Sequence, residues 1–270
     1  QKQQLLTLFD TNAMNYRNGK FVSKLKELQN EDGAWSWYKG MSGNRYMTTQ
    51  IIELLARLRA MVPDIDKDQE MNEVYRKGFE YLKKQAREEY ERIKKSEKKE
   101  NLILSEQVLR YLYICALDNT LEAEKDVNEF FLQMLEPQSA RLTIYGKSLA
   151  SIVYQHAGRM EKAEELLRSV MEYSVVSEEM GRYFDTEKAP YSWFSYKIPT
   201  EVMAIEALTR LGKDKETVEQ MKRWLLKQKQ TQAWDMPIAT VDAVYALLMT
   251  GYDWLEHAPS AEIVLGEEVI

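Results

Sequence analysis

Helical periodicity is the sequence feature that most constrains this fold. In residues 48–61, TTQIIELLARLRAM, apolar residues recur at the i, i+3, i+4 and i+7 positions that share one helix face. Glycine occurs 11 times and proline 6 times in 270 residues, so few positions interrupt long helices. No convincing alternating, strand-like pattern occurs before about residue 260. The sequence therefore predicts an all-α fold.

Two kinds of helix are expected, and their difference predicts the architecture. Residues 241–249, VDAVYALLM, carry one charge and are otherwise apolar on every side, and residues 202–211 are nearly as apolar. A helix that is apolar all round is expected to be buried all round. Residues 71–100, by contrast, carry charges over most of their surface, with many acid–base pairs four positions apart. Inner apolar helices alternating with outer charged ones predict an α/α toroid, which is two concentric rings of helices.

A repeat supports this architecture. ELLARL (53–58) and EALTRL (206–211) place Glu, Leu, Arg and Leu at the same offsets, and a Ser-Trp-aromatic triplet precedes each. A weaker third copy leads from an aromatic loop into the helix that ends near residue 251. Such recurrence is typical of helical repeats and closed helical barrels. The aromatic loops would lie at one rim of the barrel, and the candidate rim or interface residues are Trp35, Trp37, Tyr38, Tyr46, Trp193, Phe194 and Trp234.

The composition is that of a globular protein with a substantial core, with 44% hydrophobic and 30% charged residues. No run of about 18 apolar residues exists that could span a membrane. The net charge of −6 argues against nucleic acid as a partner, because phosphate binding needs a basic face. Cys115 is the sole cysteine and is expected to be a buried small hydrophobe. Since His156 and His257 lack ligand spacing as well, we predict neither a metal nor a cofactor.

Three local motifs have structural interpretations. YGKS (145–148) resembles the end of a phosphate loop but lacks both the earlier glycine and a preceding strand. DIDKDQEMNEVY (64–75) begins like a calcium loop but lacks the glycine and glutamate that such loops need, so we expect a solvated turn that caps the following helix. Residues 145–173 resemble one tetratricopeptide unit, but a single copy is better explained as one outer–inner helix pair.

Carboxylates on the apolar helices are the candidates for acid–base catalysis, as in a glycoside hydrolase. Glu53 and Glu206 each have an arginine four residues further on, which favours ion pairs within one helix. Asp242 stands alone and could instead bond a neighbouring helix end. Three loop acids keep an enzymatic interpretation open: Asp32, Asp185 and Asp235.

Both ends of the chain resemble the thioester domains of bacterial alpha-2-macroglobulin-like proteins. Residues 28–58 are similar to a toroid unit in which Leu-Gln-x-x-Asp-Gly-Gly-Trp leads into a tryptophan-rich loop and then Tyr-x-Thr, and residues 224–251 are similar to the last such unit. Residues 5–29 look like the variant from Bacteroidetes-type bacteria. The matching residues are Leu28, Gln29, Asp32, Gly33, Trp35, Trp37, Tyr46 and Thr48, then Trp224, Leu225, Gln228, Trp234, Thr240, Asp242, Ala243 and Val244. Gln29, Gly33 and Trp35 also fit the repeat of triterpene cyclases, whose acidic catalytic cluster is absent here.

The resemblance implies a part in protease trapping. Family members form a thioester within a Cys-x-Glu-Gln motif, and it acylates an attacking protease. This chain contains no such motif: Cys115 is followed three residues later by Asp118, and Leu104 stands where the cysteine would belong in LSEQ (104–107). The histidine that complement relatives place in the first rim loop is also missing between Ser36 and Tyr46. No catalytic residue is therefore carried over, and the motif is expected upstream of Gln1 or lost. Tryptophan-rich loops would suit exclusion of water from a thioester, or docking of a neighbouring domain.

We therefore expect a non-enzymatic toroid domain over residues 1–252, with other domains of the same polypeptide and proteases as partners. Residues 253–270 are expected to begin a β-sandwich module, because SAEIVLGEEVI (260–270) is strand-like. The resemblance implies a periplasmic or cell-surface location. Two alternatives remain: a carbohydrate-active α/α toroid that uses aromatic loops and loop acids, and a tetratricopeptide-type interaction scaffold.

Overall fold

The computed structural model describes residues 11–62, 68–96, 102–185, 196–231 and 237–249, together with 264–265 and 268–269. These residues are mostly helical, which confirms the all-α prediction in its main feature. The helices are α2 (Thr11–Leu28), α3 (Arg45–Met61), α4 (Gln69–Lys95), α5 (Glu106–Leu117), α6 (Lys125–Leu135), the 3-10 helix η3 (Glu136–Arg141), α7 (Ile144–His156), α8 (Met160–Met171), α9 (Lys197–Arg210), α10 (Lys215–Thr231) and α11 (Pro237–Met249).

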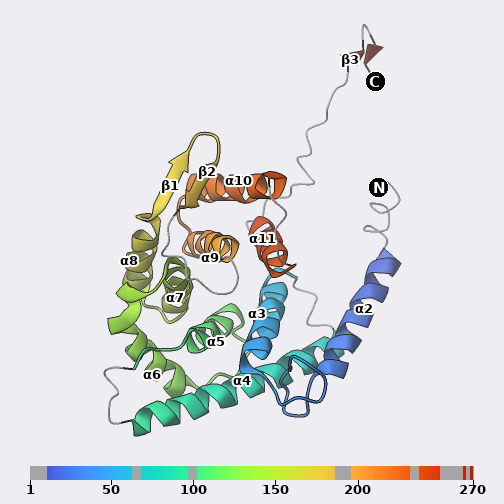
Figure 1. Ribbon diagram of the computed structural model, residues 1–270, viewed down its shortest axis with the longest axis vertical. Coiled ribbons are helices and arrows are strands. Elements are labelled where there is room, and N and C mark those ends of the chain that lie inside the picture. The colour runs from blue at the N-terminus through green and yellow to red at the C-terminus, as the bar shows by residue number, and fades with distance from the viewer. Residues whose placement is uncertain are drawn as a thin grey trace.

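Odd-numbered and even-numbered helices occupy different places (Figure 1). Close packing joins α3 to α5, α5 to α7, α7 to α9 and α9 to α11, so the odd-numbered helices form one inner row. Outside this row, α4 packs against α3 and α5, α8 against α7, and α10 against α9, while α2 packs against α4. One continuous hydrophobic core runs between the two rows. The predicted alternation of inner and outer helices is therefore present.

Burial follows the sequence pattern in most helices. Residues 200–208 of α9 are buried without interruption, as their apolar composition predicts. Helix α4 buries only one stripe and leaves its charged face outward. Asp68 caps the start of α4 by accepting a hydrogen bond from the backbone N–H of Met71 at 3.0 Å, which agrees with the predicted capping turn. Helices α7 and α8 form the expected pair, with α7 buried along its length and α8 along one face.

Helix α11 departs from its prediction. Ala243, Tyr245 and Ala246 are buried, but Val241, Val244 and Leu248 are exposed by 47%, 44% and 59%. The expectation that residues 241–249 are buried on every side is therefore wrong. An apolar helix is buried only where neighbours cover it, and the helices that pack closely on α11 are α9 and α10. One apolar stripe thus faces outward.

A short hairpin was also missed. Strands β1 (Ser174–Ser177) and β2 (Gly181–Phe184) pair in antiparallel register, Ser174 with Phe184 and Ser177 with Gly181. The expectation of no strand before residue 260 is therefore wrong, because four residues per strand are too few to establish an alternating pattern. The hairpin gains its packing from α10, where Tyr183 stacks on Trp224 at 5.9 Å between ring centroids.

The C-terminal tail contains a second antiparallel strand pair. Strands β3 (Val264–Leu265) and β4 (Glu268–Val269) place Val264 opposite Val269. The other residues between 250 and 270 lie outside the described residues, so the β-sandwich module and the boundary at residue 252 stay predictions. Within the described part of the chain, no helix combines the length and apolar character that crossing a bilayer requires.

Candidate functional site

Three of the predicted rim residues lie in the loop between α2 and α3, and Tyr46 lies in the first turn of α3. These four residues divide into two groups. Trp35 is only 3% exposed and lies in the core, where its indole N–H donates to the Leu25 carbonyl oxygen at 3.0 Å. Its backbone N–H donates to Thr48 Oγ1 at 2.9 Å. Trp35 is therefore a packing residue that fixes the loop to α2 and α3, and its placement at an exposed rim is corrected.

Trp37 and Tyr38 of this loop and Tyr46 at the start of α3 face solvent. Trp37 and Tyr38 are 58% and 75% exposed, and Tyr46 is also exposed. The rings of Trp37 and Tyr46 stack, with centroids 6.3 Å apart and planes 16° from parallel. We call Trp37, Tyr38 and Tyr46 the aromatic face. The remaining predicted rim residues lie outside the described residues: Trp193, Phe194 and Trp234.

Two of the three loop acids, Asp32 and Asp185, lie within the described residues. Asp32 accepts a hydrogen bond from the backbone N–H of Ala34 at 3.1 Å, which is a turn-stabilising role. Asp185 is exposed and follows β2 directly. Asp235 lies outside the described residues.

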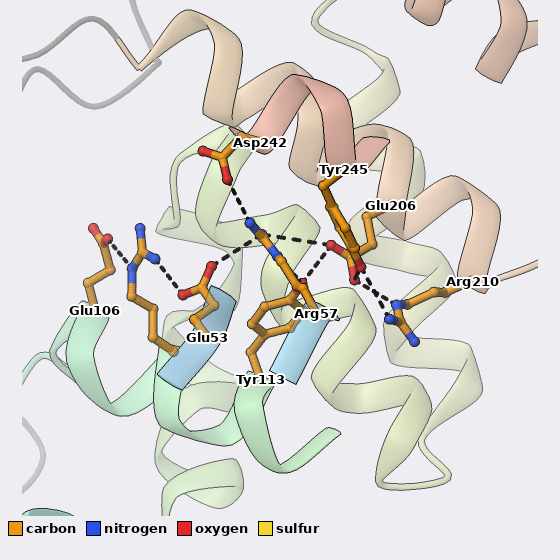
Figure 2. A network of polar contacts seen from close by, with 9 residues as sticks. Glu53, Arg57, Glu106, Tyr113, Glu206, Arg210, Asp242 and Tyr245 are labelled. Atoms are coloured by element: carbon orange, nitrogen blue, oxygen red, sulfur yellow. Dashed lines mark hydrogen bonds and ion pairs between the residues drawn. The ribbon is translucent and has the colours of Figure 1, made fainter. Parts of the chain in front are cut away.

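A buried polar network lies among the inner helices, and Arg57 of α3 is at its centre (Figure 2). The Nη1 atom of Arg57 donates to Asp242 Oδ1 of α11 at 2.7 Å, and Nε donates to the Tyr113 hydroxyl of α5 at 3.1 Å. Nη2 lies 3.2 Å from Glu53 Oε1 and 3.8 Å from Glu206 Oε2. One guanidinium thus contacts side chains from α3, α5, α9 and α11.

Glu206 of α9 anchors the second half of the network. It is completely buried, and each of its oxygens accepts hydrogen bonds. Oε1 accepts from Arg210 Nε at 2.7 Å and from the Tyr245 hydroxyl at 2.9 Å. Oε2 accepts from the Tyr113 hydroxyl at 2.5 Å. Every partner comes from an inner helix, so the carboxylate joins α9 to α5 and α11.

Glu53 extends the network from Arg57 to Arg110 and Glu106 of α5. Its Oε2 atom accepts from Arg110 Nη1 of α5 at 2.6 Å, and Arg110 Nε donates to Glu106 Oε1 at 2.9 Å. The Arg110 guanidinium also lies over the ring of Tyr145 in α7, at 5.2 Å from its centroid. The predicted pairs within one helix, Glu53 with Arg57 and Glu206 with Arg210, are therefore both confirmed.

The electrostatics of this network favour a structural role. Burial alone lowers the pKa of Arg57, but Tyr113, Glu53 and Asp242 hold it well above the ordinary value, so the guanidinium stays charged. Burial raises the pKa of Asp242, and Arg57 opposes that rise. Acid–base catalysis needs a carboxyl group within reach of a substrate. Glu53, Glu206 and Asp242 instead use their oxygens to bind arginine and tyrosine side chains.

The contacts that these side chains make between different helices were not predicted from the sequence. Asp242 was expected to be alone or at a helix end, whereas it binds an arginine 185 residues earlier in the chain. Tyr113 and Tyr245 were not singled out, although both hydroxyls bond Glu206. The available signal was the rarity of charge on otherwise apolar helices, since buried charges need partners.

Two further predictions concern single side chains. Cys115 is buried as expected, and burial raises the pKa of its thiol to about 12. His156 ends α7, as expected, and partial burial lowers its pKa. In the described residues, no group of three or more His, Cys, Asp or Glu side chains is arranged to hold a metal ion.

Glu201 is a buried acid that the sequence analysis did not identify. It is 1% exposed near the start of α9, and its Oε1 atom has no hydrogen-bond partner. Burial raises the pKa of Glu201 well above its ordinary value, and a backbone hydrogen bond with Phe184 opposes this only in part. The carboxyl group therefore favours the protonated form in the folded protein.

Glu201 should make folding stability pH-dependent. A raised pKa in the folded state means that the stability linked to this group is full below about 4.5, the ordinary value, and is lost as pH rises toward the raised value. We expect wild type to lose stability relative to Glu201→Gln as pH rises above about 4.5, by at most about 1.4 kcal/mol per pH unit for one proton. Urea unfolding of both proteins measures this, with exposed Glu161→Gln as the matched control. Parallel pH profiles for wild type and Glu201→Gln would contradict the prediction.

No protein-family model matches the chain, and no curated protein matches it either. Inferences about function therefore depend on the residues and on the geometry described above.

Proposed function

We propose that this chain is the toroid domain of a bacterial alpha-2-macroglobulin-like protein, with a non-enzymatic part in protease trapping at the cell envelope. The observation that carries the proposal is the set of hydrogen bonds that fixes the segment from 28 to 48. The side-chain amide of Gln29 donates to the carbonyl oxygens of Gly33 and Val74, at 2.9 Å each. Thr48 holds the backbone of Trp35. Four of the residues that carry the resemblance, Gln29, Gly33, Trp35 and Thr48, thus hold the segment that contains the aromatic face through hydrogen bonds.

The helix arrangement supports the toroid. Successive odd-numbered helices pack side by side, and even-numbered helices lie outside them (Figure 1). Arg57 brings the first and last helices of the inner row, α3 and α11, into contact through Asp242. A closed ring needs such a junction, because an open superhelix would leave its end helices apart.

The buried network supports a non-enzymatic role. Glu53, Glu206 and Asp242 are the candidate catalytic acids on the apolar helices, and all three bind arginine side chains inside the inner row. Among the described residues, the aromatic face is exposed and available to a partner. Exposed, stacked aromatic rings suit docking of another domain of the same polypeptide, because they bury a large apolar area at low cost in side-chain entropy.

A carbohydrate-binding role is the second candidate, and it rests on the same stack. Sugar rings pack on exposed aromatic faces, and Trp37 and Tyr46 offer two nearly parallel rings. Titration of the protein with oligosaccharides while tryptophan fluorescence is followed distinguishes the two. A saturable change that Trp37→Ala abolishes would favour the sugar, and no change would favour domain docking.

Protease trapping is tested on the full-length native protein that contains this chain. Chymotrypsin is incubated with an excess of the full-length protein. We expect the protease to keep its activity on a small peptide substrate and to lose its activity on casein, because a trapped protease is enclosed but intact. The Trp37→Ala variant should trap less protease, whereas Val176→Ala, which alters an exposed side chain on β1, should trap normally. Undiminished casein cleavage by wild type would contradict the proposal.

A further inference from the structure

One junction in the inner row differs from the others. Close packing joins α3, α5, α7, α9 and α11 in sequence, but α3 and α11 meet chiefly through side chains. Arg57 Nη1 lies 2.7 Å from Asp242 Oδ1, and its guanidinium carbon lies 4.8 Å from the centroid of the Tyr245 ring. The first and last helices of the row are thus joined through one arginine.

Helix α11 is anchored unevenly. Ala243 and Ala246 are fully buried in a helix that packs closely on α9, and small side chains allow such close approach. The Tyr245 hydroxyl also bonds Glu206 of α9. The stripe of Val241, Val244 and Leu248 is exposed. Helix α11 is therefore attached to α9 through an extensive apolar contact and to α3 through a local polar contact.

The polar attachment is buried, so the cost of desolvation opposes it. Arg57 and Glu53 of α3 and Arg110 of α5 act electrostatically on Asp242. Glu206, Arg210 and Tyr245 belong to the part of the network beyond Arg57 (Figure 2). The cost of burying a carboxylate offsets much of its attraction to a guanidinium. The raised pKa of Asp242 is consistent with this, because burial outweighs the pull of Arg57.

We propose that the contact between Arg57 and Asp242 is a latch that holds α11 against α3. When the latch opens, α11 separates from α3 but stays packed on α9. Such an opening is a local event, because the packing among α3, α5, α7 and α9 does not depend on Asp242. The opening exposes Arg57 and its neighbours in the network. The newly exposed surface is then continuous with the apolar stripe of α11. The proposal concerns the fold and does not depend on the protease-trapping function.

Hydrogen exchange of the complete 270-residue chain tests the latch. In Asp242→Ala we expect backbone amides of 241–249 to exchange at least about 10-fold faster than in wild type, and amides of α5 and α7 to change by less than about 2-fold. Asp242→Asn keeps an oxygen that can accept from Arg57, so it should restore most of the protection. Glu106→Ala removes a different acid from the same network and should leave α11 unchanged.

The possible outcomes separate clearly. Faster exchange confined to α11, rescued by Asp242→Asn, supports the latch. Unchanged exchange in α11 contradicts it. Equal acceleration in every helix also contradicts it, because Asp242 would then stabilise the whole fold and would not control one junction. A failure of Asp242→Asn to rescue would mean that the charge on the carboxylate, and not its contact with Arg57, protects α11, and would overturn the latch as well.

Discussion

Replacing Arg57 with methionine should lower the free energy of unfolding by about 3–5 kcal/mol, the range seen when one partner of a buried ion pair is removed. Methionine keeps much of the length of the side chain but supplies no charge and no donor. Asp242 would then lose the arginine that it binds at 2.7 Å, and Glu53 and Glu206 would lose a shared positive charge. The hydroxyl group of Tyr113 would also lose the hydrogen bond that it accepts from Nε of Arg57.

Urea unfolding at pH 7 measures this loss, and the chain offers a matched control. Lys77 pairs with Glu73 at 2.8 Å on the exposed side of α4, so Lys77→Met removes an ion pair of similar length that water already screens. We expect no measurable change for Lys77→Met. A loss below about 1 kcal/mol for Arg57→Met would show that the network is a weakly coupled group of polar side chains and not the centre of the inner row.

This network illustrates how far sequence patterns reach. The ion pairs of Glu53 with Arg57 and of Glu206 with Arg210 were predictable because helix geometry brings residues four apart together. The contact of Arg57 with Asp242 was not, because it depends on the order in which the helices pack. Local spacing carries no information on which helices become neighbours.

Burial was predictable to a similar extent. The apolar run in α9 is buried because helices cover it on all sides, whereas the more apolar α11 lies at the end of the row and exposes Val244 and Leu248. An apolar composition allows a helix to be buried, but its position in the fold determines how much of its surface neighbouring helices cover. The same limit applies to Trp35 and Trp37, two residues apart in one loop, of which one is in the core and the other in solvent.

Gly33→Ala should destabilise the fold by about 2–5 kcal/mol through two separate causes. Gly33 has a φ of +85°, where a side chain costs about 1–2 kcal/mol. A Cβ atom there would also overlap the backbone carbonyl oxygen of Lys77 in α4, and overpacking costs about 1–3 kcal/mol. The carbonyl group cannot move away easily, because it belongs to a helix backbone. The loop would therefore have to lift from α4.

Gly40 provides the control within the same loop. Its φ is +89°, yet nothing lies within 4 Å of an added Cβ, so Gly40→Ala isolates the backbone cost of about 1–2 kcal/mol. The difference between the two variants in urea unfolding measures the close approach of the loop to α4. Because Gln29 bonds both Gly33 and Val74 of α4, Gly33→Ala should also displace the segment that leads to the aromatic face. Equal losses for both variants would mean that the loop is free to shift, and the aromatic face would then not be held in a fixed place for a partner.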